Sequence, residues 1–414
     1  MVPNGWEKTD LNHLINIKHG FAFKSEYFRE TGEYILLTPG SFYEKGGFKD
    51  QKDKTKYYIG EIPDSYLLSK NDLLVAMTEQ ASGLLGSALF VPEQNIYLHN
   101  QRLGKVEIKA KELIDLNFLY LTFNSPLARK QISEQSTGTK VKHTSPDKLK
   151  SIICLLPPLL EQQKIAKILS AWDKAISTTE RLIENSTQQK KALMQQLLTG
   201  KKRLLDESGK RFEGEWEERA VSSLGKIYSG GTPSTSNTEY WDGDINWITP
   251  TDITKQDSRY INSSLRKITL EGLESSSAKL VPAGSLLICT RATIGAMAIT
   301  SHEMCTNQGF KNIVPNSKNN IEFVYYLLTY NKHRMISKAS GSTFLELSKT
   351  SFESMKFKTP LLKEQQKIAT VLTSADKEIE LLEQQLADLQ QEKKALMQQL
   401  LTGKKRVVVD GEVA

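Results

Sequence analysis

The chain has 414 residues, long enough for two or three domains, and its 39% apolar and 25% charged content is that of an ordinary globular protein. Its net charge of +7 is compatible with nucleic-acid binding but does not require it. Three cysteines without a CxxC spacing exclude a disulfide framework, and no apolar run approaches the ~18 residues of a membrane span, so we expect a cytoplasmic protein without a membrane partner.

The first segment, residues 1–156, is predicted to be a globular domain of mixed α/β (α+β) type. Short apolar runs bounded by Gly, Pro, Asn and Ser indicate strands, and longer apolar patterns after them indicate helices. The expected strands are Tyr34–Leu37, Leu73–Met77 and Ala88–Val91, and the expected helices cover Leu113–Asn124 and Ala128–Ser133.

A lysine-rich stretch, Lys45–Lys56, lies between the first two of these strands. It holds five lysines against two aspartates, with glycines near its tip. The pattern fits a solvated hairpin, and it also fits a loop that contacts DNA phosphates. Its candidate DNA-binding residues are Lys45, Lys49, Lys52, Lys54 and Lys56.

A long helix is predicted within residues 157–200. Apolar residues recur there at heptad spacing, which is the pattern of a coiled coil or a long paired helix. Pro157 and Pro158 mark its beginning, and Gly200 suits the left-handed position after its end. The predicted seam residues are Ile165, Leu169, Trp172, Ile176, Ile183, Leu193 and Leu197.

A polar linker, residues 201–215, leads to a second globular domain, residues 216–358, again of mixed type. Apolar runs bounded by turn-forming residues predict its strands, and apolar periodicity predicts its helices. The expected strands are Leu286–Cys289 and Ala296–Ile299, and the expected helices are Ile321–Leu328 and Lys332–Ala339.

Two features of the second domain suit contact with DNA. Ser229–Tyr240 is rich in Gly, Ser and Thr, so it is either a flexible surface loop or a loop that lies against a nucleic-acid backbone. Arg, Asn and Gln side chains match the hydrogen-bonding edges of purines. The Asn-Gln pair recurs in the first domain as Asn100 and Gln101, so a structural role is equally open. The candidates are Ser229, Thr232, Ser234, Thr235, Arg291, Asn307 and Gln308.

A second long helix is predicted within residues 359–403, followed by a polar tail, residues 404–414. Thr359 is a candidate N-cap, and Gly403 repeats the role expected of the glycine that ends the first helix. The predicted seam residues are Ile368, Leu372, Ile379, Leu382, Leu386, Leu389, Leu396 and Leu400.

The two halves of the chain form a tandem duplication. Residues 190–203 and 393–406 are identical, and EQQKIA occurs at 161–166 and at 364–369 with the same offset of 203 residues. Each helix would be roughly 60 Å long, too long for a small domain, so we expect the two helices to pack on each other. Either sense is possible, and a two-fold relation between the halves favours an antiparallel pair.

Lys190 and Lys393 occupy the same position in this apolar seam. A lysine there can bury its aliphatic stem and extend its ammonium group to water. The alternative is that the lysine fixes the register of the two helices or faces a partner.

The chain lacks several common catalytic motifs. It lacks a GxxxxGK[ST] phosphate loop, an HExxH or clustered Cys/His metal site, a GxSxG elbow and the [DN]PP[YFW] tetrapeptide of N6-adenine methyltransferases. A nuclease-like match of Pro63-Asp64 with Glu107–Lys109 is expected by chance in a chain rich in Lys and Glu. We therefore expect no catalysis and no bound metal.

Several motifs together resemble the specificity subunits of type I restriction-modification systems. The second domain contains GGTPSTSNTEYWDGDINWITPTDI (Gly230–Ile253) and later TRATIGAMAI and TNQGF, and EQQKIA opens both helices shortly after Pro-Leu-Leu. The resemblance covers the whole chain. The first domain departs from the pattern, with KHGFAFKSEYF (Lys18–Phe28) in place of GGTPS, as expected if the two domains read different sequences.

The resemblance implies two target-recognition domains, each of which reads one half of a bipartite site in double-stranded DNA. It also implies that the paired helices set the spacing and dock two adenine-N6 methyltransferase subunits, and that restriction/translocase subunits join them. In that family S-adenosylmethionine and ATP/Mg are used by the partner subunits, so this chain would bind no cofactor. Two rival interpretations are an adaptor with two ligand-binding heads that does not bind DNA, and a nuclease with an unrecognised site.

Overall fold

The structure is a computed structural model that describes residues 2–79, 83–139, 141–256, 258–341 and 345–409. It divides into two compact units. Unit 1 consists of Met1–Thr179 and Gln385–Ala414, and unit 2 of Glu180–Gln384. Among the described residues, no helix is long and apolar enough to cross a membrane.

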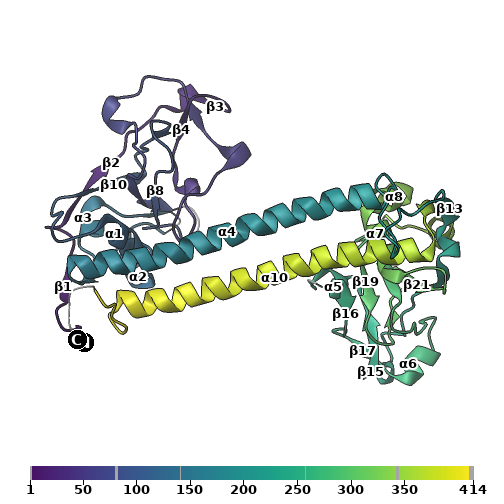
Figure 1. Ribbon diagram of the computed structural model, residues 1–414. Helices are drawn as coiled ribbons and strands as arrows, with labels where there is room; N and C mark the ends of the chain where they lie inside the picture. Colours follow the sequence, from purple (N-terminus) through teal and green to yellow (C-terminus); the bar gives the residue numbers. More distant parts are fainter. Residues whose placement is uncertain (1, 80–82, 140, 257, 342–344, 410–414) are drawn as a thin grey trace. The chain divides into compact units, whose positions relative to one another are not determined.

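Two small sheets build the globular part of unit 1 (Figure 1). One has the strand order β2-β10-β6-β8 and the other β3-β5-β4-β9, while β1 pairs with β12 and β11 with β7. The strands are β1 (Glu7–Thr9), β2 (Ile15–His19), β3 (Phe28–Arg29), β4 (Tyr34–Leu36), β5 (Tyr57–Tyr58), β6 (Leu73–Ala76), β7 (Thr78–Glu79), β8 (Ala88–Phe90), β9 (Tyr97–Leu98), β10 (Leu103–Ile108), β11 (Lys142–His143) and β12 (Cys154–Leu156).

Three short helices pack beside these sheets: α1 (Leu116–Phe123), α2 (Pro126–Glu134) and α3 (Pro146–Lys150). Each begins at a residue whose side chain accepts backbone N–H groups of the first turn: Asp115, Ser125 and Ser145. The main core joins β2, β6 and β10 to α1 and α2, with fully buried Leu14, Val75 and Phe123. The apolar runs predicted from the sequence are β4, β6 and β8, and the predicted helices are α1 and α2.

Unit 2 has a similar plan, in which the large sheet has one more strand than in unit 1 and the small sheet one fewer. Its large sheet has the order β14-β21-β18-β19-β16, its small sheet β17-β15-β20, and β13 pairs with β22. The strands are β13 (Glu217–Ala220), β14 (Gly225–Ser229), β15 (Trp241–Ile248), β16 (Tyr260–Ile261), β17 (Lys267–Ile268), β18 (Leu286–Cys289), β19 (Met297–Thr300), β20 (Cys305–Thr306), β21 (Phe310–Pro315) and β22 (Lys356–Thr359). The helices are α5 (Pro250–Thr254), α6 (Leu270–Glu274), α7 (Ile321–Tyr330), α8 (Lys332–Lys338) and α9 (Lys349–Glu353).

Strand registers show which residues of the two domains are equivalent. In unit 1 Val75 pairs with Gly104, and in unit 2 Ile288 pairs with Lys311, so β6 corresponds to β18 and β10 to β21. Both small sheets contain a parallel pair, β4 with β9 and β15 with β20. Thr38 and Thr249 are equivalent as well, because both form capping boxes at short helical turns.

Two long helices extend from these domains, α4 (Leu159–Leu197) and α10 (Leu362–Leu401). In unit 1 the beginning of α4 and the end of α10 share one core, with Ile165, Leu169 and Leu400 buried. In unit 2 the end of α4 shares a core with the beginning of α10, with Leu197 and Leu372 buried. Each unit therefore holds the helices antiparallel (Figure 1).

None of the predicted seam residues of the two helices is exposed. Those at the helix ends are buried in the domain cores, and those toward the middle are half-buried. The buried residues are Ile165, Leu169, Ile176, Leu197, Ile368, Leu372 and Leu400, and the half-buried ones are Trp172, Ile183, Leu193, Ile379, Leu382, Leu386, Leu389 and Leu396.

The C-terminal ends of both long helices agree with the prediction from the sequence, whereas the N-terminal end of α10 does not. Gly200 (φ +71°) and Gly403 (φ +67°) adopt the predicted left-handed conformation after each helix. The prediction that Thr359 caps α10 is wrong, because Thr359 is the last residue of β22, where it pairs with Glu217. The helix begins only after Pro360, at Leu362.

Candidate nucleic-acid interface

All five candidate lysines of unit 1 lie at the surface. Residues 42–48 form the expected hairpin, in which Phe42 bridges Phe48 and Gly46 and Gly47 take positive φ at its tip. The rest of the stretch is not part of the hairpin, because residues 52–54 form a 3₁₀ turn. Two lysine ammonium groups lie over aromatic rings: Lys49 is 6.0 Å from the ring of Tyr43, and Lys56 is 5.6 Å from that of Phe28. The loop thus presents cations to solvent, as a phosphate-contacting loop requires.

The Gly/Ser/Thr loop of unit 2 is held by two tryptophans. The indole of Trp247 donates to the Gly231 carbonyl at 2.8 Å, and that of Trp241 donates to the Ser234 carbonyl at 3.1 Å. A Cβ at Gly230 would lie 1.9 Å from the Asn307 carbonyl oxygen, so only glycine allows this approach. The loop is therefore fixed to the domain. Ser229 and Thr232 are half-buried, and Ser234 and Thr235 are exposed.

The asparagine of the Asn-Gln pair has a structural role that both domains share. Asn307 Oδ1 accepts the backbone N–H of Gly309 at 2.9 Å, and Asn100 Oδ1 accepts that of Arg102 at the same distance. The asparagine in each unit thus closes its own turn, as the alternative interpretation of the sequence allowed. Gln308 is exposed, and its side-chain oxygen accepts the hydroxyl of Thr232, which brings two of the predicted candidates together.

Arg291 lies two residues after the end of β18, and its guanidinium already has a partner. It forms an ion pair with Glu346, with Nη2 2.5 Å and Nε 3.1 Å from Oε2. The buried Lys311 lies nearby on β21, and burial lowers the pKa of its ammonium group. The burial of Lys311 could not be predicted from the sequence, because a single lysine within an apolar strand is expected to face solvent.

A buried cluster of polar contacts in unit 1 lies where the two long helices meet the domain, and the sequence did not predict it. Glu161 is buried, and its carboxylate receives two hydrogen bonds of 2.7 Å from the guanidinium of Arg406. The indole of Trp6 donates to the same carboxylate at 2.9 Å. We call this trio the Trp–Glu–Arg clamp.

Unit 2 contains a second Trp–Glu–Arg clamp from the equivalent residues. Arg203 donates to both oxygens of Glu364, at 2.6 and 2.7 Å, and the indole of Trp216 donates at 3.3 Å. In both units the arginine ends the repeated KKALMQQLLTGKKR segment of one helix and the glutamate begins the EQQKIA segment of the other. The two segments that are identical in both halves of the chain are therefore the segments that contact each other.

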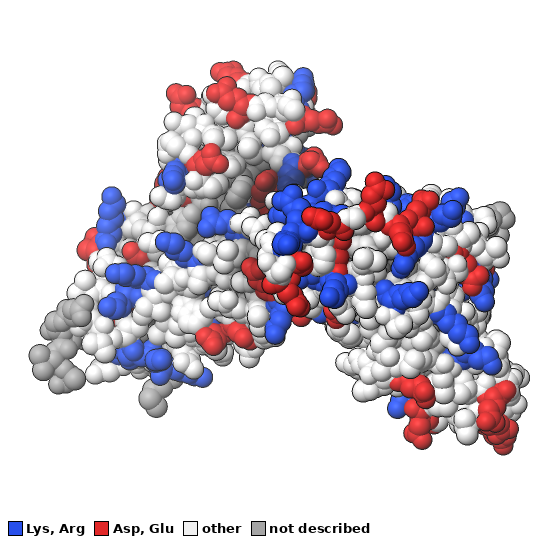
Figure 2. Space-filling model, turned by 45° about the vertical axis from the view of Figure 1, so that its right-hand side comes forward, with Lys and Arg blue, Asp and Glu red and all other residues white. Residues whose placement is uncertain are grey.

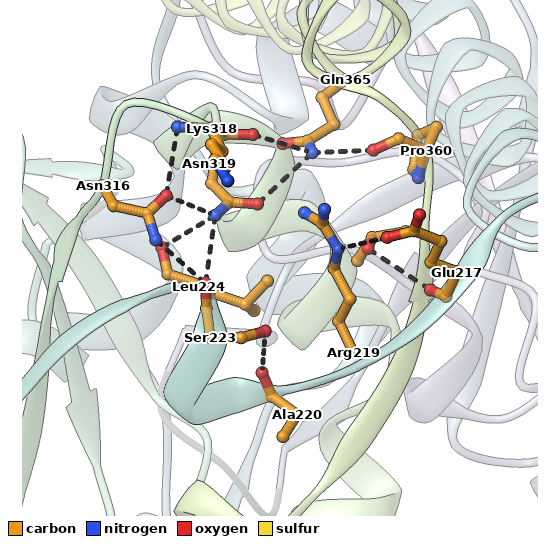
Figure 3. A network of polar contacts seen from close by, with 11 residues as sticks. Glu217, Arg219, Ala220, Ser223, Leu224, Asn316, Lys318, Asn319, Pro360 and Gln365 are labelled. Carbon is orange, nitrogen blue, oxygen red and sulfur yellow. Dashed lines mark hydrogen bonds and ion pairs between the residues drawn. The ribbon is translucent and has the colours of Figure 1, made fainter.

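The first glutamine of each EQQKIA segment anchors its helix to the domain beside it. Gln162 bonds the backbone of Pro157, Leu113 and Asp115. Figure 3 shows the counterpart in unit 2, where Gln365 donates to the Pro360 carbonyl at 2.9 Å and reaches Asn319.

The Gln365 network borders an open cleft of about 510 Å³. Its lining includes Arg219, Ser223, Asn316 and Lys318, several of which take part in the network of Figure 3. Asn319 donates to the carbonyls of Ser223 and Leu224, so the cleft lies where the domain is tied to α10.

The two seam lysines form ion pairs between the helices. In unit 1, Lys393 Nζ lies 2.5 Å from Asp173 Oδ1, and in unit 2 Lys190 binds Asp376. These contacts favour the interpretation that the lysines fix register. Asp376 also accepts the hydroxyl of Tyr326 and lies 3.4 Å from the guanidinium of Arg259.

Three further features bear on the chemistry of the protein: its surface charge, its potential metal ligands and its cysteines. Lys and Arg are interspersed with Asp and Glu over the face shown in Figure 2. Among the described residues no group of three His, Cys, Asp or Glu side chains could hold a metal ion. Cys154, Cys289 and Cys305 are buried, and burial raises the pKa of each thiol to about 12, so none is a reactive thiolate.

Comparisons with known proteins agree with this architecture. A 171-residue match to the MjaIX specificity subunit of Methanocaldococcus jannaschii is 39% identical and covers 40% of this chain and 39% of that subunit. The putative MjaX specificity subunit of the same organism is 28% identical over 98% of this chain and 95% of its own length. The solved S subunit of a type I restriction-modification system from M. genitalium has a TM-score of 0.61 at 15% identity, covering 97% of this chain and 98% of that one.

The sequence model of one family matches the chain twice, at residues 3–186 and 213–391, once for each half of the duplication. The two matches together span well over half of the chain. The chain belongs to the family of the type I restriction modification DNA specificity domain, of which it carries two copies.

Proposed function

We propose that this chain is the DNA-recognition subunit of a type I restriction-modification complex, and that each globular domain reads one half of a bipartite site. The observation that carries the proposal is the contrast within the repeat. The Trp–Glu–Arg clamps, the capping boxes and the Asn turns are the same in both units, whereas the exposed loops differ. Two copies of one scaffold with different surface loops are what reading two different half-sites requires.

The candidate contacts divide by their chemistry. The lysines of the 45–56 loop suit phosphates, which position a protein on DNA without reading sequence. Arg291 and Gln308 suit purine edges, provided that DNA displaces Glu346 and Thr232, their present partners. The exposed Ser234 and Thr235 suit backbone contacts.

The paired helices suit the task of holding two readers at a fixed separation. A single small domain contacts only a few base pairs, so joining two domains increases specificity through effective concentration. Half-sites on one face of DNA lie about one helical turn apart, roughly 34 Å. A helix of 39 residues is roughly 58 Å long and is stiffer than a loop.

The catalytic steps belong to partners in this proposal. Two adenine-N6 methyltransferase subunits that use S-adenosylmethionine dock on the helices, and restriction/translocase subunits that use ATP and Mg join for cleavage. The complex acts on DNA in the cytoplasm. Family membership supports this division, because the family is one of DNA specificity domains.

The proposal is tested by single-molecule methylome sequencing of a methylation-negative host that expresses the chain with its cognate methyltransferase subunit. The expected result is one bipartite N6-methyladenine motif, which would also reveal both half-sites. A stable complex without any methylated motif would contradict DNA reading by the two domains. Absence of a salt-dependent affinity for duplex DNA would favour the adaptor interpretation, because a protein that contacts phosphates releases counterions.

A further inference from the structure

A small cavity lies among the loops of unit 1, beside the small sheet β3-β5-β4-β9. Its volume is about 160 Å³. Phe23, Phe28 and Leu36 supply apolar walls, and Lys56, Gln101 and Arg102 supply polar ones. The cavity therefore combines an aromatic surface with two cations and with the amide side chains of Asn100 and Gln101.

The aromatic side of the cavity is held in place from behind. The rings of Phe23 and Tyr58 meet edge to face at 4.8 Å, and those of Phe23 and Phe21 at 5.1 Å. Phe23 and Tyr58 are buried, while Phe28 is half-buried beside the cavity. A preformed aromatic wall costs little to organise when a planar ligand stacks on it.

The polar side is exposed and available. Lys56, Gln101 and Arg102 are all exposed, and the Lys56 ammonium lies 5.6 Å from the centre of the Phe28 ring. Within the described part of the chain, the side chains of Gln101 and Arg102 have no hydrogen-bond or ion-pair partner. Their donors are free to meet a ligand that enters above the ring.

Unit 2 has the same arrangement at the equivalent place, with larger rings. Phe28 pairs with Tyr58 in unit 1 as Trp241 pairs with Ile268 in unit 2, so Phe28 and Trp241 are equivalent. By the same registers Arg266 corresponds to Lys56. Its guanidinium lies 3.7 Å from the centre of the Trp241 ring.

The cation over an aromatic ring beside an Asn-Gln turn is thus a repeated feature of both domains. In unit 2, Trp247 stands where unit 1 has Leu36, and Gln308 is bonded to Thr232. The side chains around the cavity of unit 1 are smaller than their counterparts in unit 2. The cavity of unit 1 is therefore the candidate binding site.

We propose that the cavity of unit 1 binds a single nucleobase of the DNA strand, turned out of the base stack. The Phe28 ring stacks on the base, as aromatic side chains do with unstacked bases. The Gln101 amide bonds an edge of the base, and Lys56 and Arg102 bind the flanking phosphates. This inference rests on the proposed DNA-reading function and adds that unit 1 recognises one position by extruding its base.

The test measures the affinity of the complex of the full chain with its methyltransferase subunit for duplexes that carry the methylated motif. In each duplex one base is removed, leaving its partner unpaired, because opening an unpaired base costs less than opening a base pair. We expect tighter binding, by about tenfold, when the base opposite a methylated adenine is removed. We expect a second such gain at one position where no adenine is methylated, and that position identifies the base that enters the cavity.

Variants assign this second gain to the cavity. Lys56→Gln and Phe28→Leu should each abolish the gain at the second position and leave the gain at the methylated adenine unchanged. Lys111→Gln, which removes an exposed lysine outside the cavity, should preserve both gains. Circular dichroism spectra and unfolding curves of the variants should match those of the wild type.

Each other outcome overturns the inference. If only the methylated adenine shows a gain, unit 1 opens no base, although the proposed DNA-reading function stands. A second gain that persists in Lys56→Gln and Phe28→Leu would place the opened base elsewhere. Saturable binding of free deoxynucleoside monophosphates that Lys56→Gln weakens would show that the cavity serves a free nucleotide. Absence of any methylated motif would overturn the proposed function together with this inference.

Discussion

At the residue scale, the most consequential contacts are the two Trp–Glu–Arg clamps. Each carboxylate is almost fully buried, and each arginine binds it through two parallel hydrogen bonds, a geometry stronger than a single neutral bond. The guanidinium also lies near the tryptophan ring, at 5.6 Å for Arg406 and Trp6. Removing one member leaves buried polar groups without partners.

We predict that Glu161→Ala destabilises unit 1. It leaves the Trp6 indole and the Arg406 guanidinium without their acceptor, at a cost on the order of 2–3 kcal/mol, less than the roughly 3–5 kcal/mol of fully buried pairs because Arg406 is partly exposed. Differential scanning calorimetry should show a lower melting temperature for the transition of unit 1. Glu364→Ala should do the same in unit 2, and an unchanged pair of transitions would show that the clamps are dispensable.

His99 provides a prediction about pH. It is fully buried, and burial lowers the pKa of its imidazole to about 4. Between pH ~6.5 and ~4 the unfolded chain therefore takes up a proton that the folded chain does not, so stability falls as the pH falls through this window. The contribution is fully lost below about pH 4.

The pH dependence of urea unfolding should be shallower in His99→Gln than in the wild type over this window. The difference should approach a few kcal/mol, at about 1.4 kcal/mol per pH unit. Gln can still donate to the Leu103 carbonyl, which His99 contacts through Nε2 at 2.9 Å. Equal pH dependence in both proteins would mean that His99 is readily protonated in the folded chain.

At the scale of elements, the long helices rely on tertiary contacts at their ends and on the seam along their length. The seam is only half-buried toward the middle, so apolar burial alone fixes register weakly there. Directional contacts specify it more strongly, as polar residues within coiled-coil seams do. Lys393 with Asp173, and Lys190 with Asp376, supply such contacts.

We predict that Lys393→Asp lowers the stability of unit 1, since it places two carboxylates together in the seam. Adding Asp173→Lys should restore most of the loss, and the double-mutant cycle should give a coupling energy of about 1 kcal/mol. Chemical denaturation measures each variant. Lys394→Asp alters an exposed neighbour and should have little effect, and a coupling energy near zero would remove the register role.

At the scale of the whole molecule, the duplication joins two readers through one pair of helices. Both helices continue from one unit into the other, because the boundaries of the units fall within them, after Thr179 and after Gln384. Inserting residues at these two boundaries therefore lengthens both helices and leaves each unit's own contacts intact.

We predict that inserting one heptad after Thr179 and another after Gln384 lengthens the spacer of the methylated motif and changes neither half-site. A heptad adds about 10 Å of helix, which corresponds to roughly three base pairs at 3.4 Å each. Methylome sequencing of the insertion variant measures the spacer directly. An unchanged spacer would show that the helices do not set it, and an altered half-site would show that the insertion disturbs the readers.

The sequence by itself determined the duplication, the mixed α/β domains, the two long helices and the main apolar strands such as β6 and β18. These features depend on local periodicity and on turn-forming residues, which neighbouring positions alone reveal. The resemblance in the 230–253 segment and the two EQQKIA segments identified the family, which the comparisons confirm. The strands of two residues, such as β3 and β5, were missed because they are too short to show a period.

Only the tertiary structure revealed the Trp–Glu–Arg clamps and the pairing of Arg291 with Glu346, and it decided in favour of the antiparallel helix pair that the duplication had favoured. The members of the first clamp lie 155 and 245 positions apart, and Arg291 and Glu346 lie 55 apart. Periodicity carries no information over such separations. The local sequence around a charged residue is the same whether that residue contacts water or a distant side chain. The position of each side chain follows from how the sheets and helices pack, and that packing is a property of the whole folded unit.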